Sequence, residues 1–138
     1  MKFMGDGLLA IFPIDDGATA DRAATSALEA AQEALAAVRR LNGEPPMVAE
    51  PPLEIVVALH VGTVVYGNIG AAERLDFTVI GPAVNLVSRL EATAKTLNTP
   101  IVLSDDFARA CGKPLTSLGH YLLRGLAKPR ELFVPSAQ

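Results

Sequence analysis

The feature that most constrains this chain is a long amphipathic repeat near its start. Thr19 is placed to cap a helix that begins at about Ala18 and runs to about Arg40, and Asn42-Gly43 is placed to end it. The apolar residues recur at the spacing of one helix face: Ala20, Ala23, Ala24, Ala27, Ala31, Ala34, Leu35 and Val38. Because most of these side chains are small, we expect the helix to pack closely against a sheet.

Strand-like segments surround this helix. Gly5-Asp6-Gly7 separates two short apolar runs, which predicts a hairpin with positive φ at both turn positions. Further strands are predicted over residues 53–65 (one long strand), 76–80, 100–103, 120–124 and 131–134, a second helix over 83–97, and a helical turn from Ser104 to Ala110. The order β-β-α-β-β-α-β-α-β-β predicts an α+β fold with helices on a sheet.

Length and composition are those of one globular domain. The chain has 138 residues, half of them apolar, and its net charge of −3 with scattered basic residues favours neither nucleic acid nor an anionic membrane as a partner. Cys111 is the single cysteine, so no disulfide can form within the chain. No apolar run approaches the roughly 20 residues that span a bilayer. We expect a cytoplasmic segment without direct membrane contact, and a longer parent protein could still be membrane-anchored.

Three blocks of residues carry possible chemistry: Lys2 to Gly7, Arg74 to Gly81, and Val84 to Glu91. Taken alone, each has an ordinary structural explanation. Asp6 suits a turn, and Thr78 suits a strand. Asn85 and Arg89 are four residues apart, so they share one helix face, which could simply be exposed and polar.

The three blocks together resemble the class III adenylyl and guanylyl cyclase catalytic domain. Gly5-Asp6 resembles the family's second metal-binding aspartate, and the stretch from Asp76 to Gly81 with Asn85 and Arg89 resembles its most distinctive motif. Residues 59–70 and 123–132 add two further matches. The resemblance implies a ferredoxin-like, antiparallel-type sheet with helices packed on it. Residues 1–138 would be the C-terminal portion of one catalytic domain, without the family's first strand and first metal aspartate.

The resemblance also implies the roles of individual residues. Asp6 would bind one of two Mg²⁺ or Mn²⁺ ions, Arg89 would steady charge on the α-phosphate of ATP, and Asn85 would orient the ribose. Lys2 and Thr78 resemble the family's base-reading pair, and their donor and acceptor complement adenine better than guanine. Arg74 would hold the terminal phosphates, with Arg124 and Lys128 as weaker candidates for that task. The implied product is 3′,5′-cyclic AMP, made in intracellular signalling.

The resemblance further implies a head-to-tail homodimer, in which Asp6 of one subunit completes the site of the other. Alternatives stay open: a non-catalytic module that binds nucleotide or dimerises, or a generic α+β interaction domain. Arg89 could instead form a salt bridge to Glu91. His60 and His120 are interpreted as structural, because a lone histidine on an apolar strand is more often a hydrogen-bonded core residue than a ligand.

Overall fold

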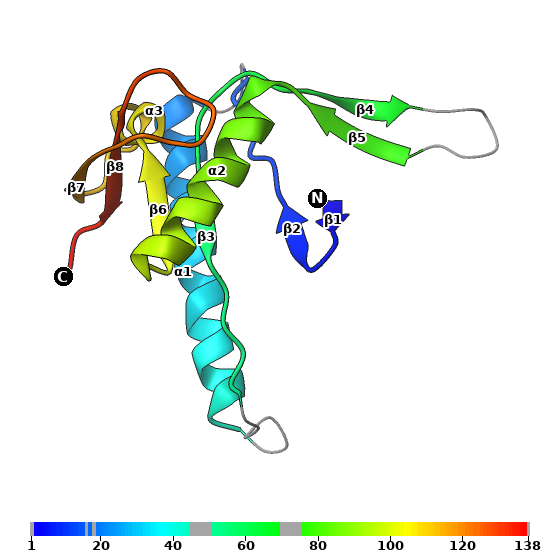
Figure 1. Ribbon diagram of the computed structural model, residues 1–138. Helices are drawn as coiled ribbons and strands as arrows, with labels where there is room; N and C mark the ends of the chain where they lie inside the picture. Colours follow the sequence, from blue (N-terminus) through cyan, green and yellow to red (C-terminus); the bar gives the residue numbers. More distant parts are fainter. Residues whose placement is uncertain (1, 16, 18, 45–50, 70–75, 138) are drawn as a thin grey trace.

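The computed structural model describes residues 2–15, 17, 19–44, 51–69 and 76–137; for residues 2–4, 66, 68–69 and 76–78 it describes the backbone. Figure 1 labels its elements in chain order. They are β1 (Lys2–Met4), β2 (Gly7–Leu9), α1 (Ala20–Asn42), β3 (Val57–Leu59), β4 (Val65–Ile69), β5 (Asp76–Ile80), α2 (Pro82–Leu97), β6 (Ile101–Ser104), α3 (Asp105–Ala110), β7 (Leu115–Tyr121) and β8 (Arg130–Pro135). The predicted α+β fold class is confirmed.

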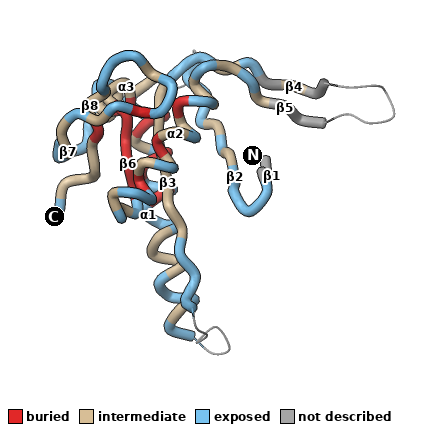
Figure 2. The backbone as a smooth tube through the Cα atoms, in the orientation of Figure 1, coloured by how far each residue is buried: buried red, intermediate tan, exposed pale blue. Residues whose placement is uncertain are grey.

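A four-stranded sheet with the order β3-β6-β8-β7 is the centre of the fold. The β3 and β6 strands are parallel, and the other two pairings are antiparallel. Strand β6 is buried at all four positions. Its side chains alternate between two apolar clusters, so both faces of the sheet are covered. Figure 2 shows this burial concentrated on β6 and the helices around it.

Helices α1 and α3 cover one face of the sheet, and α2 covers the other. Ala24, Ala27 and Leu28 of α1 pack with Leu103 of β6 and Phe107 of α3. This confirms that the alanine face packs closely against a sheet. Thr19 Oγ1 accepts a hydrogen bond of 3.2 Å from the Arg22 N–H, as the predicted N-cap requires.

The opposite cluster is built around α2. Leu86, Leu90 and Ala94 pack with Val102 of β6 and Leu132 of β8. The helix begins with Pro82 at its first turn, where the missing N–H costs no hydrogen bond. The remaining faces of α2 are therefore free to carry polar groups away from the core.

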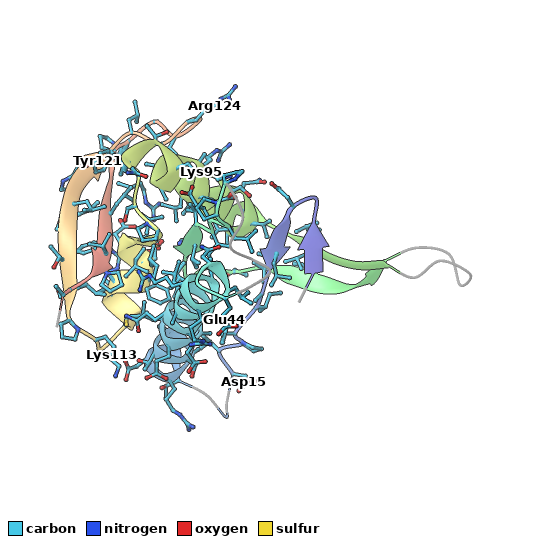
Figure 3. All side chains as sticks on the ribbon, turned by 90° about the horizontal axis from the view of Figure 1, so that it is seen from below. Asp15, Glu44, Lys95, Lys113, Tyr121 and Arg124 are labelled. Atoms are coloured by element: carbon cyan, nitrogen blue, oxygen red, sulfur yellow. The ribbon has the colours of Figure 1, made fainter. Side chains whose placement is uncertain are left out.

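Two separate two-stranded ribbons project from this core, as Figures 1 and 3 show. One pairs β1 with β2, and the other pairs β4 with β5, both antiparallel. The predicted hairpin at Gly5-Asp6 is confirmed. Positive φ occurs at Gly5 and not at Asp6, so the expectation of positive φ at both turn positions was wrong.

Two strand predictions were wrong in their extent. Of the expected long strand over residues 53–65, only Val57–Leu59 form a strand of the main sheet, because the chain leaves that sheet after β3 and pairs with β5 as β4 from Val65 onward. The expected strand over residues 120–124 is β7, which begins at Leu115 and ends at Tyr121. No helix among the described residues is both long and apolar enough to cross a membrane.

Candidate active site

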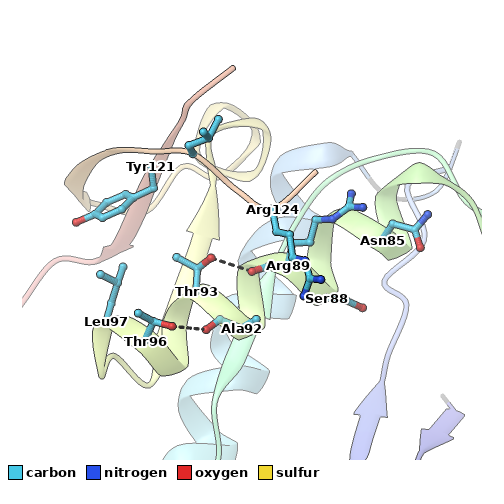
Figure 4. Close-up of a pocket in the computed structure, with 10 residues that line it drawn as sticks. Asn85, Ser88, Arg89, Ala92, Thr93, Thr96, Leu97, Tyr121 and Arg124 are labelled. Carbon is cyan, nitrogen blue, oxygen red and sulfur yellow. Dashed lines mark hydrogen bonds between the residues drawn. The ribbon is translucent and has the colours of Figure 1, made fainter. Parts of the chain in front are cut away.

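The outer face of α2 and the end of β7 with the chain that follows it line an open pocket of about 670 Å³, shown in Figure 4. The helix contributes side chains at successive turns of one face. The lining residues are Asn85, Ser88, Arg89, Ala92, Thr93, Thr96, Leu97, Tyr121, Leu122 and Arg124. The prediction that Asn85 and Arg89 share one helix face is confirmed, since both line this pocket.

Arg89 is held against the loop that follows β7. A β-carbon placed on Gly125 would lie 3.0 Å from Arg89 Nη2 and 3.3 Å from its Cζ, so the guanidinium packs on the glycine backbone. Gly125 has φ +83°, a conformation that other residues rarely adopt. Glycine at this position therefore permits both the turn and the close approach of the arginine.

Arg89 forms no ion pair with any acid in the described part of the chain. The acid proposed as its alternative partner, Glu91, pairs instead with Lys95 at 2.7 Å. A guanidinium carries five N–H donors, and in a half-buried position these need acceptors. The geometry thus leaves Arg89 available for an anion in the pocket.

Arg124 brings a second guanidinium to the same pocket from the opposite wall (Figure 4). It too has no acidic partner within the described residues. Two cations that line one hollow repel each other, and a ligand with several negative charges would relieve that repulsion. Sequence reasoning ranked Arg74 above Arg124 for this task. Arg74 lies outside the described residues, whereas Arg124 is placed at the site.

The rest of the helix face was missed by the sequence analysis. Thr93 donates a 2.9 Å hydrogen bond to the Arg89 carbonyl, and Thr96 donates one of 3.2 Å to the Ala92 carbonyl, as the dashed lines in Figure 4 mark. Ser88 donates likewise to the Val84 carbonyl at 3.1 Å. Continuing the three- and four-residue spacing from Asn85 would have found these positions.

Asp6 lies apart from this pocket, on the turn of the β1–β2 ribbon. Its carboxylate is exposed and is not among the pocket's lining groups. Asp6 therefore does not share the pocket of Asn85 and Arg89 within one chain.

The capacity to bind metal ions depends on how many ligating side chains come together. A carboxylate such as that of Asp6 is the right donor for Mg²⁺ or Mn²⁺. No group of three or more His, Cys, Asp or Glu side chains gathers anywhere in the described residues. Asp6 is thus a suitable ligand, and the described part of one chain gathers no complete two-ion site around it.

The predicted base-reading pair lies on the two ribbons. Lys2 is in β1, opposite Leu9, and Thr78 is in β5, opposite Gly67. The side chains of Lys2 and Thr78 are outside the description. Their role stays a prediction.

The two histidines differ. The His60 side chain is buried, and its Nδ1 lies 2.8 Å from Ser104 Oγ, which fits the structural interpretation. His120 lies on β7 and is exposed, so it is not a core residue.

Comparison with known proteins places this arrangement in a family. The family profile described as "Adenylate and Guanylate cyclase catalytic domain" matches residues 1–133. The chain belongs to this family. An adenylate cyclase of Anabaena cylindrica is 35% identical over 117 residues, which cover 82% of this chain and 22% of that cyclase. The chain spans between 16% and 24% of the length of the curated relatives it matches.

Solved structures of cyclases share the fold. The guanylyl cyclase Cya2 superposes with a TM-score of 0.76 at 28% identity, covering 96% of this chain and 66% of that one. The adenylyl cyclase CyaB from P. aeruginosa gives a TM-score of 0.72 at 24% identity, covering 89% of this chain and 65% of that one. The fold of this cyclase-family domain is therefore the class III cyclase fold, and its relatives include both adenylyl and guanylyl enzymes.

Proposed function

We propose that this domain converts ATP to 3′,5′-cyclic AMP and pyrophosphate. The ribose 3′-oxygen attacks the α-phosphorus, and the bond from that phosphorus to the oxygen bridging the β-phosphate breaks. Pyrophosphate leaves, and the 3′-hydroxyl proton passes to solvent. Such a phosphoryl transfer depends on positioning and on neutralising charge. The observation that carries the proposal is the pair of arginines, Arg89 and Arg124, that line one pocket without acidic partners in the described chain.

Arg89 and Arg124 divide the phosphate contacts between them. Arg89 is fixed on Gly125 and half-buried, so it suits the α-phosphate, where charge accumulates during the reaction. Arg124 is exposed at the rim and suits the leaving pyrophosphate. Asn85, one turn before Arg89 on the same wall, orients the ribose through its amide.

The proposed reaction also requires bound divalent metal ions. Bound Mg²⁺ or Mn²⁺ would activate the attacking oxygen and stabilise the leaving oxygens. Asp6 would supply one ligand. Because no group of three or more ligating side chains forms among the described residues, we expect the chain by itself to produce little cyclic AMP.

The working unit in this proposal is a head-to-tail homodimer with sites at its interface. Asp6 lies off the pocket that holds Asn85 and Arg89, which supports a site shared between two copies. In a two-fold dimer the same surface serves both subunits, so Asp6 of each copy would complete the pocket of the other.

Base preference completes the proposal: ATP is chosen over GTP. Adenine presents an acceptor at ring N1 and a donor at its amino group, which match a lysine donor and a threonine acceptor. Lys2 and Thr78 would provide this pair. Guanine presents the opposite polarity, and an unpaired buried polar group costs roughly 1–3 kcal/mol.

The second candidate function is a non-catalytic module that binds nucleotide or dimerises. The absence of an acidic cluster among the described residues favours it. The third possibility, a generic interaction domain unrelated to cyclases, is excluded by the family match.

Nucleotide binding and turnover together test these candidates. ATP affinity would be measured by calorimetry, and cyclic AMP and pyrophosphate would be quantified with Mn²⁺ or Mg²⁺. Variant Arg89→Ala should lose both activities, whereas Arg40→Ala, an exposed arginine at the end of α1, should keep them. Turnover that is small but depends on Arg89 supports the cyclase. Arg89-dependent binding without any turnover supports the non-catalytic module, and ATP binding that ignores Arg89 contradicts both.

A further inference from the structure

A buried histidine outside the pocket connects three elements of the core. His60 directly follows β3, and its side chain is 6% exposed. Its Nδ1 lies 2.8 Å from Ser104 Oγ. That hydroxyl oxygen also accepts a 3.0 Å hydrogen bond from the Phe107 N–H, which caps α3. One edge of the imidazole ring is thus tied to the beginning of α3.

The other edge of the ring faces Gly62, which packs against the beginning of α2. A β-carbon placed on Gly62 would lie 2.9 Å from His60 Nε2 and 2.7 Å from Ala83 Cβ, so the ring, the glycine and α2 leave no room for a methyl group. Gly81, the N-cap of α2, is similarly close to the Thr63 carbonyl, at 3.1 Å from its own hypothetical β-carbon. The first turn of α2 therefore rests on residues 60–63.

This contact bears on the pocket because α2 carries its functional side chains. Asn85 lies two residues after Ala83, and Arg89 lies one turn further along the same face. Close-packed interiors transmit small displacements instead of absorbing them. A shift of the His60 ring would therefore move the first turn of α2 and the Asn85 amide with it.

Among the described residues, the charged groups that act on the ring lie on its Nδ1 side. Asp106 of α3 has its Oδ2 atom 4.0 Å from Nδ1. Arg130 of β8 donates 2.7 Å hydrogen bonds to that same oxygen and to Asp105 Oδ1, and Arg109 of α3 pairs with the other oxygen of Asp106. On the Nε2 side, Gly62 and Ala83 bring no charge. Burial lowers the pKa of His60, with Asp106 opposing this shift and Arg130 adding to it.

We propose that His60 is a positioning residue whose neutral imidazole holds the first turn of α2 in place, and whose protonation releases that turn. A neutral ring can rest its Nε2 edge against Gly62, which in turn packs on Ala83. Protonation adds a charge that attracts Asp106, whose Oδ2 atom lies 4.0 Å from Nδ1, so the ring moves toward α3 and away from Gly62. The catalytic consequence rests on the proposed cyclase function, whereas the structural consequence does not.

Nuclear magnetic resonance of the intact chain tests the structural consequence directly. The chain has only two histidines, so a His120→Gln variant assigns the ring signals and serves as the matched control. We expect the amide signals of Val84 and Asn85 to shift with pH at the midpoint of the His60 ring. In His60→Gln that titration should vanish, and in His120→Gln it should remain. Amides that do not follow His60, or that still titrate in His60→Gln, would overturn the proposal.

A second variant covers the case in which His60→Gln does not fold. In Asp106→Asn, the charge that favours imidazolium is removed, so the His60 midpoint should move to lower pH. The Val84 and Asn85 amides should move by the same amount. If the ring midpoint moves and the amides stay behind, the ring does not control the helix.

Kinetics separate this proposal from the proposed function. Between neutral pH and the acid side of the ordinary histidine pKa of about 6.5, kcat should fall more in the wild type than in His60→Gln. KM should change little, because the proposal concerns how Asn85 is aligned with the transition state and not how tightly the substrate binds. If the wild type forms no cyclic nucleotide at any pH, the cyclase function fails, and the amide titration still decides whether His60 positions α2. Equal pH profiles in an active enzyme would overturn the catalytic consequence.

Discussion

The four-stranded core and the two ribbons of this molecule differ in how far their apolar side chains are buried. In the core, Leu132 and its neighbours on β6 and α2 are fully buried between the sheet and its helices. On the ribbons, Leu8, Val65 and Ile80 are 54%, 61% and 51% exposed. A two-stranded ribbon is marginally stable in water without a further layer. The core can hold a pocket by itself, while the β1–β2 ribbon carries Asp6 on an exposed turn that the second copy would cover in the proposed dimer.

The largest effect should come from removing the same side chain in each region. Leu132→Ala deletes a fully buried leucine and should lower the free energy of unfolding by about 2–5 kcal/mol. Leu8→Ala, its matched control on β2, should change it by less than about 0.5 kcal/mol. Urea denaturation at low protein concentration measures both. Equal losses would show that the β1–β2 ribbon is as integral to the folded chain as the core.

Complementation between the regions tests whether they meet across an interface. Asp6→Ala on the ribbon and Arg89→Ala on the core should each reduce turnover, by about 10²–10³ for the arginine. This experiment belongs in the longest active form of the protein. Mixed and allowed to exchange subunits, the two variants should regain about a quarter of the sites, since half the dimers are mixed and each of these has one intact site.

Subunit exchange must be verified independently, for example by energy transfer between labelled copies. Mixing Arg89→Ala with Arg124→Ala provides the control, because both residues line the pocket of one chain. That mixture should not regain the arginine-dependent activity. Exchange without recovery in the Asp6→Ala mixture would favour a site built within a single chain.

The preference for ATP over GTP tests whether residues on the ribbons recognise the nucleotide base in addition to forming the proposed interface. The double variant Lys2→Glu with Thr78→Cys should weaken the preference for ATP over GTP by roughly 1–3 kcal/mol, which is about fivefold to 150-fold. The ratio of kcat/KM for the two nucleotides measures it. Unchanged selectivity would show that the two ribbon residues do not read the base.

The smallest effect concerns the response of the core to pH. Burial holds the pKa of His60 below its ordinary value of 6.5, so the unfolded chain binds this proton more readily than the folded one. Stability should therefore fall as the pH drops from 6.5 toward the lowered pKa, and this contribution should level off below it. Denaturant midpoints across this range check the slope.

Two histidine variants sharpen that measurement. His60→Gln should flatten the pH dependence in this window, and the exposed His120→Gln should leave it unchanged. A slope that survives in His60→Gln would have to come from another group.

Much of the fold could be predicted because its signals are local. The helix from Ala20 to Asn42, its Thr19 cap and the turn at Gly5-Asp6 depend on residues within a few positions of one another. The shared face of Asn85 and Arg89 follows from helix geometry alone. Even the blocks that resemble the cyclase family are short stretches whose order is visible without coordinates.

Only the tertiary structure decided which distant segments meet. The apolar stretch from Leu53 to Val65 reads as one strand, yet only Val57–Leu59 pair with β6, and the chain pairs with β5 from Val65 onward. Arg124 joins Arg89 across a separation that no periodicity encodes, through a glycine loop that turns back onto α2. His60 meets Ser104, 44 positions away, because β3 and β6 pair in parallel and bring their ends together. Local spacing sets which face a side chain occupies, and sheet topology sets what that face will touch.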